Sequence, residues 1–511
     1  MGTPDWNARG RLDSSASRRE LRGWHRVARR PKRTAAVLGG LVAFGLLLRF
    51  VTFNSWGIVY DGAVMSVMGE SFALHGEFLV PYAAVPTLYH HYPPLYPMYL
   101  SLFYRVLGFS IVSTKVADLV LSAVLVAVVW FTTRDFLGPR KAWYAAAFVS
   151  LEPMFLMTSL IGYSEELVGI CFVLTAWAAV KGLRDLPYLA LAGLFAGLGF
   201  LAKASIGWVF VVTLVMGFLW IRRTRGWWIL RDKWFLTGTG IFVLLAGGWT
   251  LRNLAVYGWP HWDTSTYLDA VYSYGIGHPA LLAEALVVKV PLFLLFFLLY
   301  GGLFLPELRL SRRAAVGEAT GLLWTIIGST FLMGWMVSSF FWTVEQTPLW
   351  WWDNLRYVVI TAPLILWLVL RETEPRWSFT RAPSTDLRSF SKRFAVLMAV
   401  FLAIGLAIVA FPAPYPQMAV MQNLDAYLQP GAVVGVDGIS PETILPYISV
   451  PNVSVIPYHG GLAAAYILSA TSSVYSGFIH VTTIHSGDML GEAFACSLWA
   501  RAGTALADAA S

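Results

Sequence analysis

The feature that most constrains this chain is a series of apolar runs, each about as long as a bilayer is thick. A helix needs about 20 apolar residues to cross the roughly 30 Å hydrocarbon core of a membrane. The stretches 204–221, 234–251 and 319–344 reach that length without a single charged residue. Only 13% of the 511 residues are charged, against about 25% in an ordinary soluble domain. A water-soluble protein is therefore excluded.

Eleven segments are long and apolar enough to be membrane spans. They are 34–53, 111–133, 142–160, 165–181, 186–202, 204–221, 234–252, 285–305, 319–342, 355–370 and 394–412. The predicted fold class is an all-α polytopic membrane protein with about 11 transmembrane helices. The connections near residues 162 and 203 are very short, and a merge or split there would reverse the topology of everything downstream.

Lys and Arg lie mainly in alternate connections. With a cytoplasmic N-terminus, the inner segments hold 29 of the 37 basic residues and 11 of the 29 acidic ones. This asymmetry is what the positive-inside rule predicts. We therefore expect a multi-pass plasma-membrane protein with its N-terminus inside and its C-terminus outside. The net charge of +8 is the sum of a basic inner side and an acidic outer side, so nucleic acid is not an expected partner.

Three parts of the chain are expected. Residues 1–33 form a basic cytoplasmic tail, predicted to be disordered, and 34–412 form the membrane module with a large first outer loop at 54–110. Residues 413–511 are long enough for a small extracytoplasmic domain. There, 432–436, 453–456 and 477–481 are typical of strands. The alanine-rich stretch 461–471 has a helical pattern, which predicts a compact α/β domain.

Asp61 follows the first span in an aromatic segment of the outer loop. A carboxylate beside aromatic rings at the membrane interface is partly desolvated, which favours a general base for an acceptor hydroxyl. The structural alternative is an N-cap for a helix that begins at Gly62. The two roles are compatible.

The same loop carries His90, His91 and Tyr92, followed by Pro93 and Pro94. The prolines predict an extended entry into a helix, which would hold the histidine pair near the membrane surface. Adjacent residues seldom both reach one metal ion, so hydrogen bonding or packing is the favoured role for the pair. We predict that these three residues line the site.

Lys203, Arg252 and Arg356 lie near outer helix ends, on the side that is otherwise depleted of Lys and Arg. Cations retained at that depth favour an anionic ligand such as a lipid phosphate. The structural alternative is snorkelling, or pairing with an acidic side chain of the outer side.

Two acidic features lie within or beside the spans. Ser164, Glu165 and Glu166 open the fourth span, and an N-cap with acids in the first turn is the favoured explanation, although Glu165 is also predicted to line the site. Glu152 precedes Pro153 within the third span, where a structural role in a kink is plausible. The sequence gives no firm account of Glu152.

The order of these features resembles the GT-C glycosyltransferases, and most of all the branch with protein O-mannosyltransferases, lipid A aminoarabinose transferases and lipopolysaccharide-core galacturonosyltransferases. The resemblance covers about residues 35–370. It rests on Asp61 after the first span and on these segments: Tyr92-Pro93-Pro94-Leu95-Tyr96-Pro97, Phe103-Tyr104-Arg105-Val106-Leu107-Gly108, Phe200-Leu201-Ala202-Lys203 and Trp249-Thr250-Leu251-Arg252-Asn253.

The resemblance implies a membrane enzyme that moves a sugar from a polyprenyl-phosphate donor to a glycan, lipid or protein acceptor on the outer side, with inversion. Asp61 then matches the catalytic position, and Lys203 and Arg252 match contacts to the carrier phosphate. The family often has a second carboxylate directly after the aspartate, where this chain has Gly62. No cofactor is assigned, and participation of a divalent metal ion stays open.

Two other functions compete with this one. A transporter or flippase of a lipid-linked or anionic substrate would also use interfacial cations, although the chain has no internal repeat and carries an outer domain that transport does not need. A membrane anchor or assembly subunit is the third alternative. The outer domain is expected either to select the acceptor or to cover the active-site face.

Overall fold

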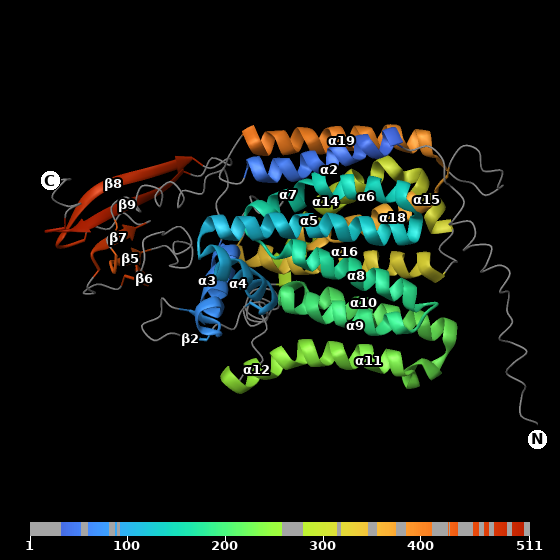
Figure 1. The fold of residues 1–511 in the computed structure, drawn as a ribbon, viewed down its shortest axis with the longest axis horizontal. Helices are drawn as coiled ribbons and strands as arrows, with labels where there is room; N and C mark the ends of the chain where they lie inside the picture. Colours follow the sequence, from blue (N-terminus) through green and yellow to red (C-terminus); the bar gives the residue numbers. More distant parts are fainter. Residues whose placement is uncertain are drawn as a thin grey trace, which may run out of the picture.

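A computed structural model of the chain describes residues 32–52, 60–80, 87–88, 92–257, 279–313, 318–345, 355–374, 385–410, 428, 430–437, 453–458, 464–469, 475–487 and 493–504. The long helices lie side by side in one bundle, and a small sheet stands at one end of it (Figure 1). We call the end of the bundle nearest this sheet the outer end and the opposite end the inner end.

Most helices of the bundle run along its length (Figure 1). They are α2 Lys32–Val51, α5 Ile111–Leu137, α6 Pro139–Leu151, α7 Pro153–Leu160, α8 Glu165–Gly182, α9 Pro187–Ala202, α10 Ala204–Arg225, α11 Lys233–Phe242, α12 Gly248–Tyr257, α14 Pro279–Gly301, α15 Leu305–Arg313, α16 Glu318–Glu345, α17 Arg356–Val359, α18 Ala362–Arg371 and α19 Leu387–Ala410. Short helical turns lie at η1 Trp227–Arg231, η2 Val243–Gly247 and η4 Gly302–Phe304.

Each of the eleven predicted span segments is mostly helical where the structure describes it. The short connections near residues 162 and 203 separate distinct helices, so neither pair merges. By length and composition, four described helices are able to cross a membrane: Thr34–Val51, Ile111–Leu137, Lys233–Ala255 and Leu387–Ile408. The total of eleven spans stays a prediction.

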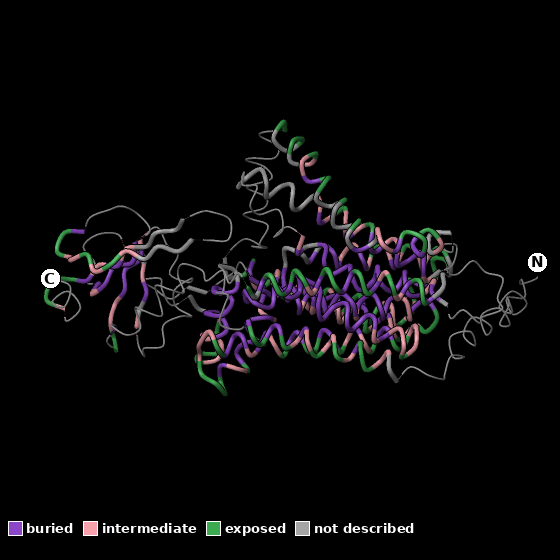
Figure 2. The backbone as a smooth tube through the Cα atoms, turned by 90° about the horizontal axis from the view of Figure 1, so that it is seen from above, coloured by how far each residue is buried: buried purple, intermediate pink, exposed green. Residues whose placement is uncertain are grey.

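Apolar side chains divide between the interior of the bundle and its outer surface. Buried residues fill the middle of the bundle in Figure 2, and exposed ones follow the sides of the helices that face outward. Leu244 and Val287 are examples of outward-facing apolar residues, at 73% and 70% exposure. Large apolar side chains on the outside of a helical bundle are what a lipid environment requires.

The first outer loop contains two helices, α3 Tyr60–His75 and α4 Leu95–Leu107, and a short antiparallel pair, β1 Leu79–Val80 with β2 Thr87–Leu88. Helix α4 starts directly after Pro94, as the two prolines predicted. Helix α3 starts at Tyr60 rather than Gly62. Asp61 therefore lies inside the first turn, and the structural alternative of an N-cap for a helix that begins at Gly62 is wrong.

A break between α6 and α7 explains Glu152. Pro153 has no N–H to donate, so the helical hydrogen bonding is interrupted there. The Glu152 carboxylate accepts a hydrogen bond from the Phe155 N–H at 2.6 Å and another from the Tyr300 hydroxyl. The Arg49 guanidinium donates to the carbonyl oxygen of Ser150, just before the break. Side chains thus satisfy the polar groups that the kink exposes.

The C-terminal region forms a five-stranded mixed sheet with the order β6-β5-β7-β9-β8. Its strands are β5 Val433–Asp437, β6 Ser454–Pro457, β7 Tyr466–Ser469, β8 Phe478–Gly487 and β9 Ala493–Arg501. Strands β6, β5 and β7 are parallel, whereas β9 is antiparallel to β7 and β8. A second, two-stranded parallel pair joins β3 Thr373–Glu374 to β4 Thr385–Asp386.

Three of the five strands match the predicted ones, and one prediction in this region is wrong. The stretch 461–471, expected to be helical, contains strand β7 instead. All four β7 residues are buried between β5 and β9. Burial of an aromatic and aliphatic strand in the middle of the sheet outweighs the weak helical preference of the three alanines before it.

Candidate functional site

Three helix ends meet at the outer end of the bundle and bring two cations to one carboxylate. Lys203 lies in extended conformation between α9 and α10, Glu165 is the first residue of α8, and Arg356 is the first residue of α17. The Lys203 Nζ lies 2.7 Å from Glu165 Oε1, and the Arg356 Nε lies 3.5 Å from the same oxygen. Both cations also lie over the Tyr163 ring, 5.1 and 4.5 Å from its centroid. We call these four residues the outer cluster.

The outer cluster is almost completely buried, with Glu165 at 0%, Lys203 at 2% and Arg356 at 8% exposure. Charges in such a place interact more strongly than they do in water, and they are costly unless paired. The N-terminus of α8 adds a favourable dipole for the carboxylate. The two cations outnumber the one carboxylate, so the cluster carries net positive charge in a dry environment, which suits an anionic ligand such as a phosphate.

Consecutive glutamates of α8 serve two different networks. Glu165 belongs to the outer cluster, whereas Glu166 faces α2 and α5. The Glu166 carboxylate accepts a hydrogen bond from the Ser122 hydroxyl at 2.7 Å and lies 3.8 Å from the Arg49 guanidinium. Both acids lie in the first turn of α8, as predicted, and each also pairs with a cation. Ser164 precedes the helix as predicted, but its side chain makes no capping hydrogen bond.

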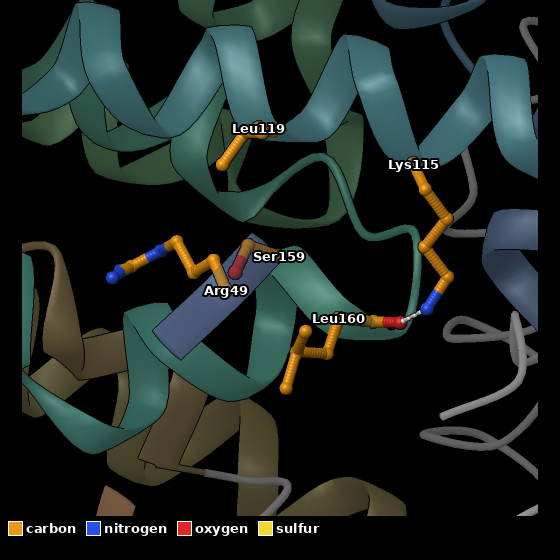
Figure 3. A pocket seen from close by; sticks show the side chains of 5 residues that line it. All are labelled: Arg49, Lys115, Leu119, Ser159 and Leu160. Carbon is orange, nitrogen blue, oxygen red and sulfur yellow. Dashed lines mark hydrogen bonds between the residues drawn. The ribbon is translucent and has the colours of Figure 1, made fainter. Parts of the chain in front are cut away.

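A small cavity of about 10 Å³ lies beside this second network (Figure 3). Its lining comes from α2, α5 and α7 and consists of Arg49, Lys115, Leu119, Ser159 and Leu160. The Lys115 ammonium donates to the carbonyl oxygen of Leu160. A buried water needs about 10–15 Å³, so this cavity is of water size and excludes a sugar or a phosphate.

The outer loop is fixed to the bundle next to the outer cluster. The Tyr96 hydroxyl of α4 donates to Asp118 of α5 at 2.5 Å and lies 3.2 Å from the carbonyl oxygen of Gly162. Gly162 directly precedes Tyr163 of the cluster. Two further tyrosines of α4 bond to α5, since Tyr99 donates to the Ala117 carbonyl and Tyr104 shares a hydrogen bond with Thr114. The loop that carries Asp61 is thereby held over the outer end.

The structure brings Lys203, Arg356 and Glu165 together, and it places the other predicted residues elsewhere or leaves them outside its description. Arg252 lies on α12, where its guanidinium stacks over Trp249, 4.7 Å from the centroid, and donates to Asn253 at 2.7 Å. Trp249 packs edge-on against Phe78, next to α3. Tyr92 is buried at 7% exposure before α4.

His90 and His91 lie outside the described residues, and for Asp61 the structure describes the backbone alone. Among the residues that were searched, no group of three or more His, Cys, Asp or Glu side chains could hold a metal ion.

The sequence did not single out Arg49 and Tyr163, and it assigned Glu166 to the helix dipole alone. Arg49 is a cation inside the outer third of an apolar run, which was a signal of function or pairing. Its partners come from α6 and α8, so the sequence could not name them. For Tyr163, nothing local in the sequence indicated that two cations would lie on its ring.

Arg49→Met is expected to destabilise the folded protein by about 3 kcal/mol, because it leaves Glu166 buried without its cation. The measurement is thermal unfolding of the purified protein in detergent. A matched control is Lys181→Met, which removes an ion pair with Asp135 that is about 30% exposed (28% and 33%) and worth at most about 1 kcal/mol. The double variant Arg49→Met with Glu166→Gln should recover part of the loss. Equal unfolding temperatures for Arg49→Met and Lys181→Met would contradict the assignment of Arg49 as the cation that stabilises the buried Glu166.

We expect the buried carboxyl group of Glu70 to make the stability of the folded protein depend on pH. Burial of its carboxyl group in the outer loop raises the pKa to about 7 from 4.5. The folded protein therefore binds more protons than the unfolded chain between these two values, so this contribution to stability falls as the pH rises through 7. Glu70→Gln should raise the unfolding temperature above pH 7 and leave it unchanged below pH 4.5. Glu77→Gln, at an exposed position of the same loop, is the control. A difference in unfolding temperature between Glu70→Gln and the wild type that stays the same at every pH would refute this explanation.

The family model of dolichyl-phosphate-mannose-protein mannosyltransferases matches residues 91–249, which include α4 to α11, Glu165 and Lys203. Comparison with curated protein sequences finds no match.

Several solved structures are similar to this chain. ArnT from Cupriavidus metallidurans bound to undecaprenyl phosphate matches with a TM-score of 0.64 and 12% identity, over 92% of this chain and 99% of that one. The apo state of the same protein gives a TM-score of 0.64 and 12% identity, over 93% and 99%. The Archaeoglobus fulgidus oligosaccharyltransferase in complex with Zn and sulfate gives 0.48 and 12%, over 84% and 68%.

Proposed function

From the premise that this chain has the GT-C glycosyltransferase fold, which its motifs predicted, we propose that it is a membrane glycosyltransferase. It moves a sugar from a polyprenyl-phosphate donor to a glycan, lipid or protein acceptor. The reaction takes place at the outer end of the bundle, on the extracytoplasmic side of the plasma membrane, with the basic N-terminal tail in the cytoplasm.

The observation that carries this proposal is the outer cluster. Lys203 and Arg356 share Glu165 in a nearly water-free place at the outer helix ends. Two cations at the outer helix ends suit the phosphate of a lipid-linked donor. Glu165 then acts as a positioning residue that holds both cations in place. The similarity in fold to a protein solved with undecaprenyl phosphate supports a donor of this chemistry.

The transfer needs a base at the acceptor and positive charge at the leaving group. Asp61 takes the proton of the acceptor hydroxyl while its oxygen attacks the anomeric carbon. The bond between that carbon and the phosphate oxygen breaks, and the polyprenyl phosphate leaves with the electron pair. Lys203, Arg356 and Arg252 stabilise the negative charge that develops on the phosphate. His90, His91 and Tyr92 line the acceptor side.

We also assign Arg252, which lies on α12, to the binding of the donor phosphate. It lies one turn after Trp249, whose ring packs against Phe78 beside α3. This contact links the helix of Arg252 to the loop that carries Asp61, which supports the assignment of both residues to one site. Neutralising Arg252 should therefore raise the apparent KM for the donor.

The test uses the purified full-length protein in nanodiscs with a panel of radiolabelled polyprenyl-phosphate sugars and native membrane extract as the source of acceptor. We expect one donor to yield a labelled covalent product together with free polyprenyl phosphate. Movement of the donor across a proteoliposome membrane without any covalent product would show that the protein is a transporter and not a glycosyltransferase. A panel in which no donor is consumed or moved would also reject the proposal.

A further inference from the structure

The connection between α10 and α11 joins these two helices at the inner end of the bundle (Figure 1). It contains the short turn η1 Trp227–Arg231 and leads directly into Lys233–Ala255, one of the described helices that are able to cross a membrane. The connection therefore lies where the apolar interior of a bilayer meets the lipid headgroups. We call residues 222–233 the inner corner.

Large apolar side chains of the inner corner are open to the surroundings. Trp227, Trp228 and Leu230 are 60%, 50% and 43% exposed. Ile229, in the middle of the same turn, is fully buried and holds the turn on the bundle. Adjacent exposed apolar side chains indicate a surface that contacts another molecule, and tryptophan is enriched where a membrane meets water. The exposed side chains of this turn are therefore suited to contact lipid.

The inner corner also carries an excess of positive charge. Its sequence contains five basic residues and one acidic residue. The acidic residue, Asp232, is the N-cap of α11, since its Oδ1 accepts hydrogen bonds from the N–H groups of Trp234 and Phe235 at 2.9 and 3.2 Å. The single carboxylate of the corner is thus occupied by the helix terminus, and it forms no ion pair with a described cation.

Four cations of the inner corner make no ion pair and no side-chain hydrogen bond with any other residue that the structure describes: Arg222, Arg223, Arg231 and Lys233. Two of them lie over indole rings instead. The Arg222 guanidinium is 3.6 Å from the ring centroid of Trp227, and that of Arg223 is 5.7 Å from the centroid of Trp220. A guanidinium has five N–H donors, and contact with a ring does not supply the oxygen acceptors that they need. Acceptors of opposite charge would complement these side chains.

We propose that the inner corner binds an anionic phospholipid of the adjacent leaflet. The headgroup phosphate accepts hydrogen bonds from the cations of the corner, and the glycerol and upper acyl chain pack on Trp227 and Leu230. A zwitterionic lipid would bring its own cation among four others, so an anionic headgroup is favoured. Free phosphate would leave the apolar side chains in water. The inner corner and the outer cluster lie at opposite ends of the bundle, so this inference does not depend on the proposed function.

The test uses the full-length protein in phosphatidylcholine nanodiscs that contain a trace of photoreactive lipid. Two probes carry the same photoreactive group in the acyl chain, one on phosphatidylglycerol and one on phosphatidylcholine. Trypsin releases the peptide Gly226–Arg231, and mass spectrometry measures the fraction of it that is cross-linked. We expect the phosphatidylglycerol probe to label this peptide about tenfold more than the phosphatidylcholine probe. A high salt concentration, which screens exposed charges, should remove most of this difference.

The double variant Arg222→Gln with Arg223→Gln keeps both cleavage sites of this peptide and should lower its labelling by the phosphatidylglycerol probe about tenfold. The charge-matched control, Arg184→Gln with Arg388→Gln, removes two exposed arginines from other parts of the inner end and should be labelled as the wild type is. Equal labelling by the two probes, or unchanged labelling of the Arg222/Arg223 variant, would overturn the inference. Competition by inorganic phosphate as strong as that by unlabelled phosphatidylglycerol would assign the cations to free phosphate and would also overturn it.

Discussion

Lys203→Ala is expected to lower sugar transfer by about 10²–10³-fold. The ammonium lies at 2% exposure, where a charge-assisted contact to the departing phosphate is far stronger than in water. Removing one such preorganised group costs about 3–4 kcal/mol of transition-state stabilisation in comparable sites. Arg356 remains beside Glu165, so some activity should survive. The assay compares kcat and the donor KM of the purified variant with those of the wild type.

The controls separate the loss of phosphate binding from a loss of folding. Lys181→Ala also removes a lysine that pairs with a carboxylate, since the Lys181 Nζ lies 2.8 Å from Asp135. This pair lies at the inner end of the bundle, so the variant should leave transfer unchanged. The double variant Lys203→Ala with Glu165→Gln removes one charge of each sign and should fold stably, while its transfer stays as low as that of Lys203→Ala. Wild-type kinetics in Lys203→Ala would remove Lys203 from the donor site.

Asp61→Asn is expected to reduce transfer by about 10²–10⁴-fold, the range that a positioned general base contributes. The amide keeps the size and part of the hydrogen bonding of the carboxylate, but it cannot take the acceptor proton. Helix α3 begins at Tyr60, which puts Asp61 in a first turn where the helix dipole stabilises a carboxylate. Donor binding should survive, because the proposed phosphate contacts are other residues.

Activity and donor binding are measured on the same preparation of Asp61→Asn, the latter by displacement of a fluorescent polyprenyl phosphate. Glu77→Gln, at an exposed position of the same loop, is the matched carboxylate control and should retain full activity. Transfer at the wild-type rate by Asp61→Asn would show that another group is the base.

The helices could be predicted because each is encoded locally. Apolar runs bounded by charge gave the positions of the long helices, and Pro93 and Pro94 gave the start of α4. The sheet was harder. Strand β7 is a strand because β5 and β9 lie on either side of it, and no pattern within 461–471 records those neighbours. The structural alternative for Asp61 placed the start of α3 at Gly62, two residues later than the structure has it.

In the candidate site, too, contacts between distant parts of the chain could not be predicted from the sequence. Lys203, Arg356 and Glu165 were each singled out from their depth and sign, yet their convergence depends on three helix ends from distant parts of the chain. Arg49 was passed over, although a cation in the last turn of a span needs a partner as much as the others do. Burial and pairing are properties of the packed bundle, so the individual charges are predictable and their partners are not.

The most direct test of the outer cluster is a cryo-EM map of the full-length protein in nanodiscs with bound polyprenyl phosphate. We predict phosphate density at the outer end of the bundle, within hydrogen-bond distance of the Lys203 Nζ and the Arg356 guanidinium, with the lipid chain leading into the bilayer between helices. Density for the phosphate at a place that neither cation reaches would contradict the account.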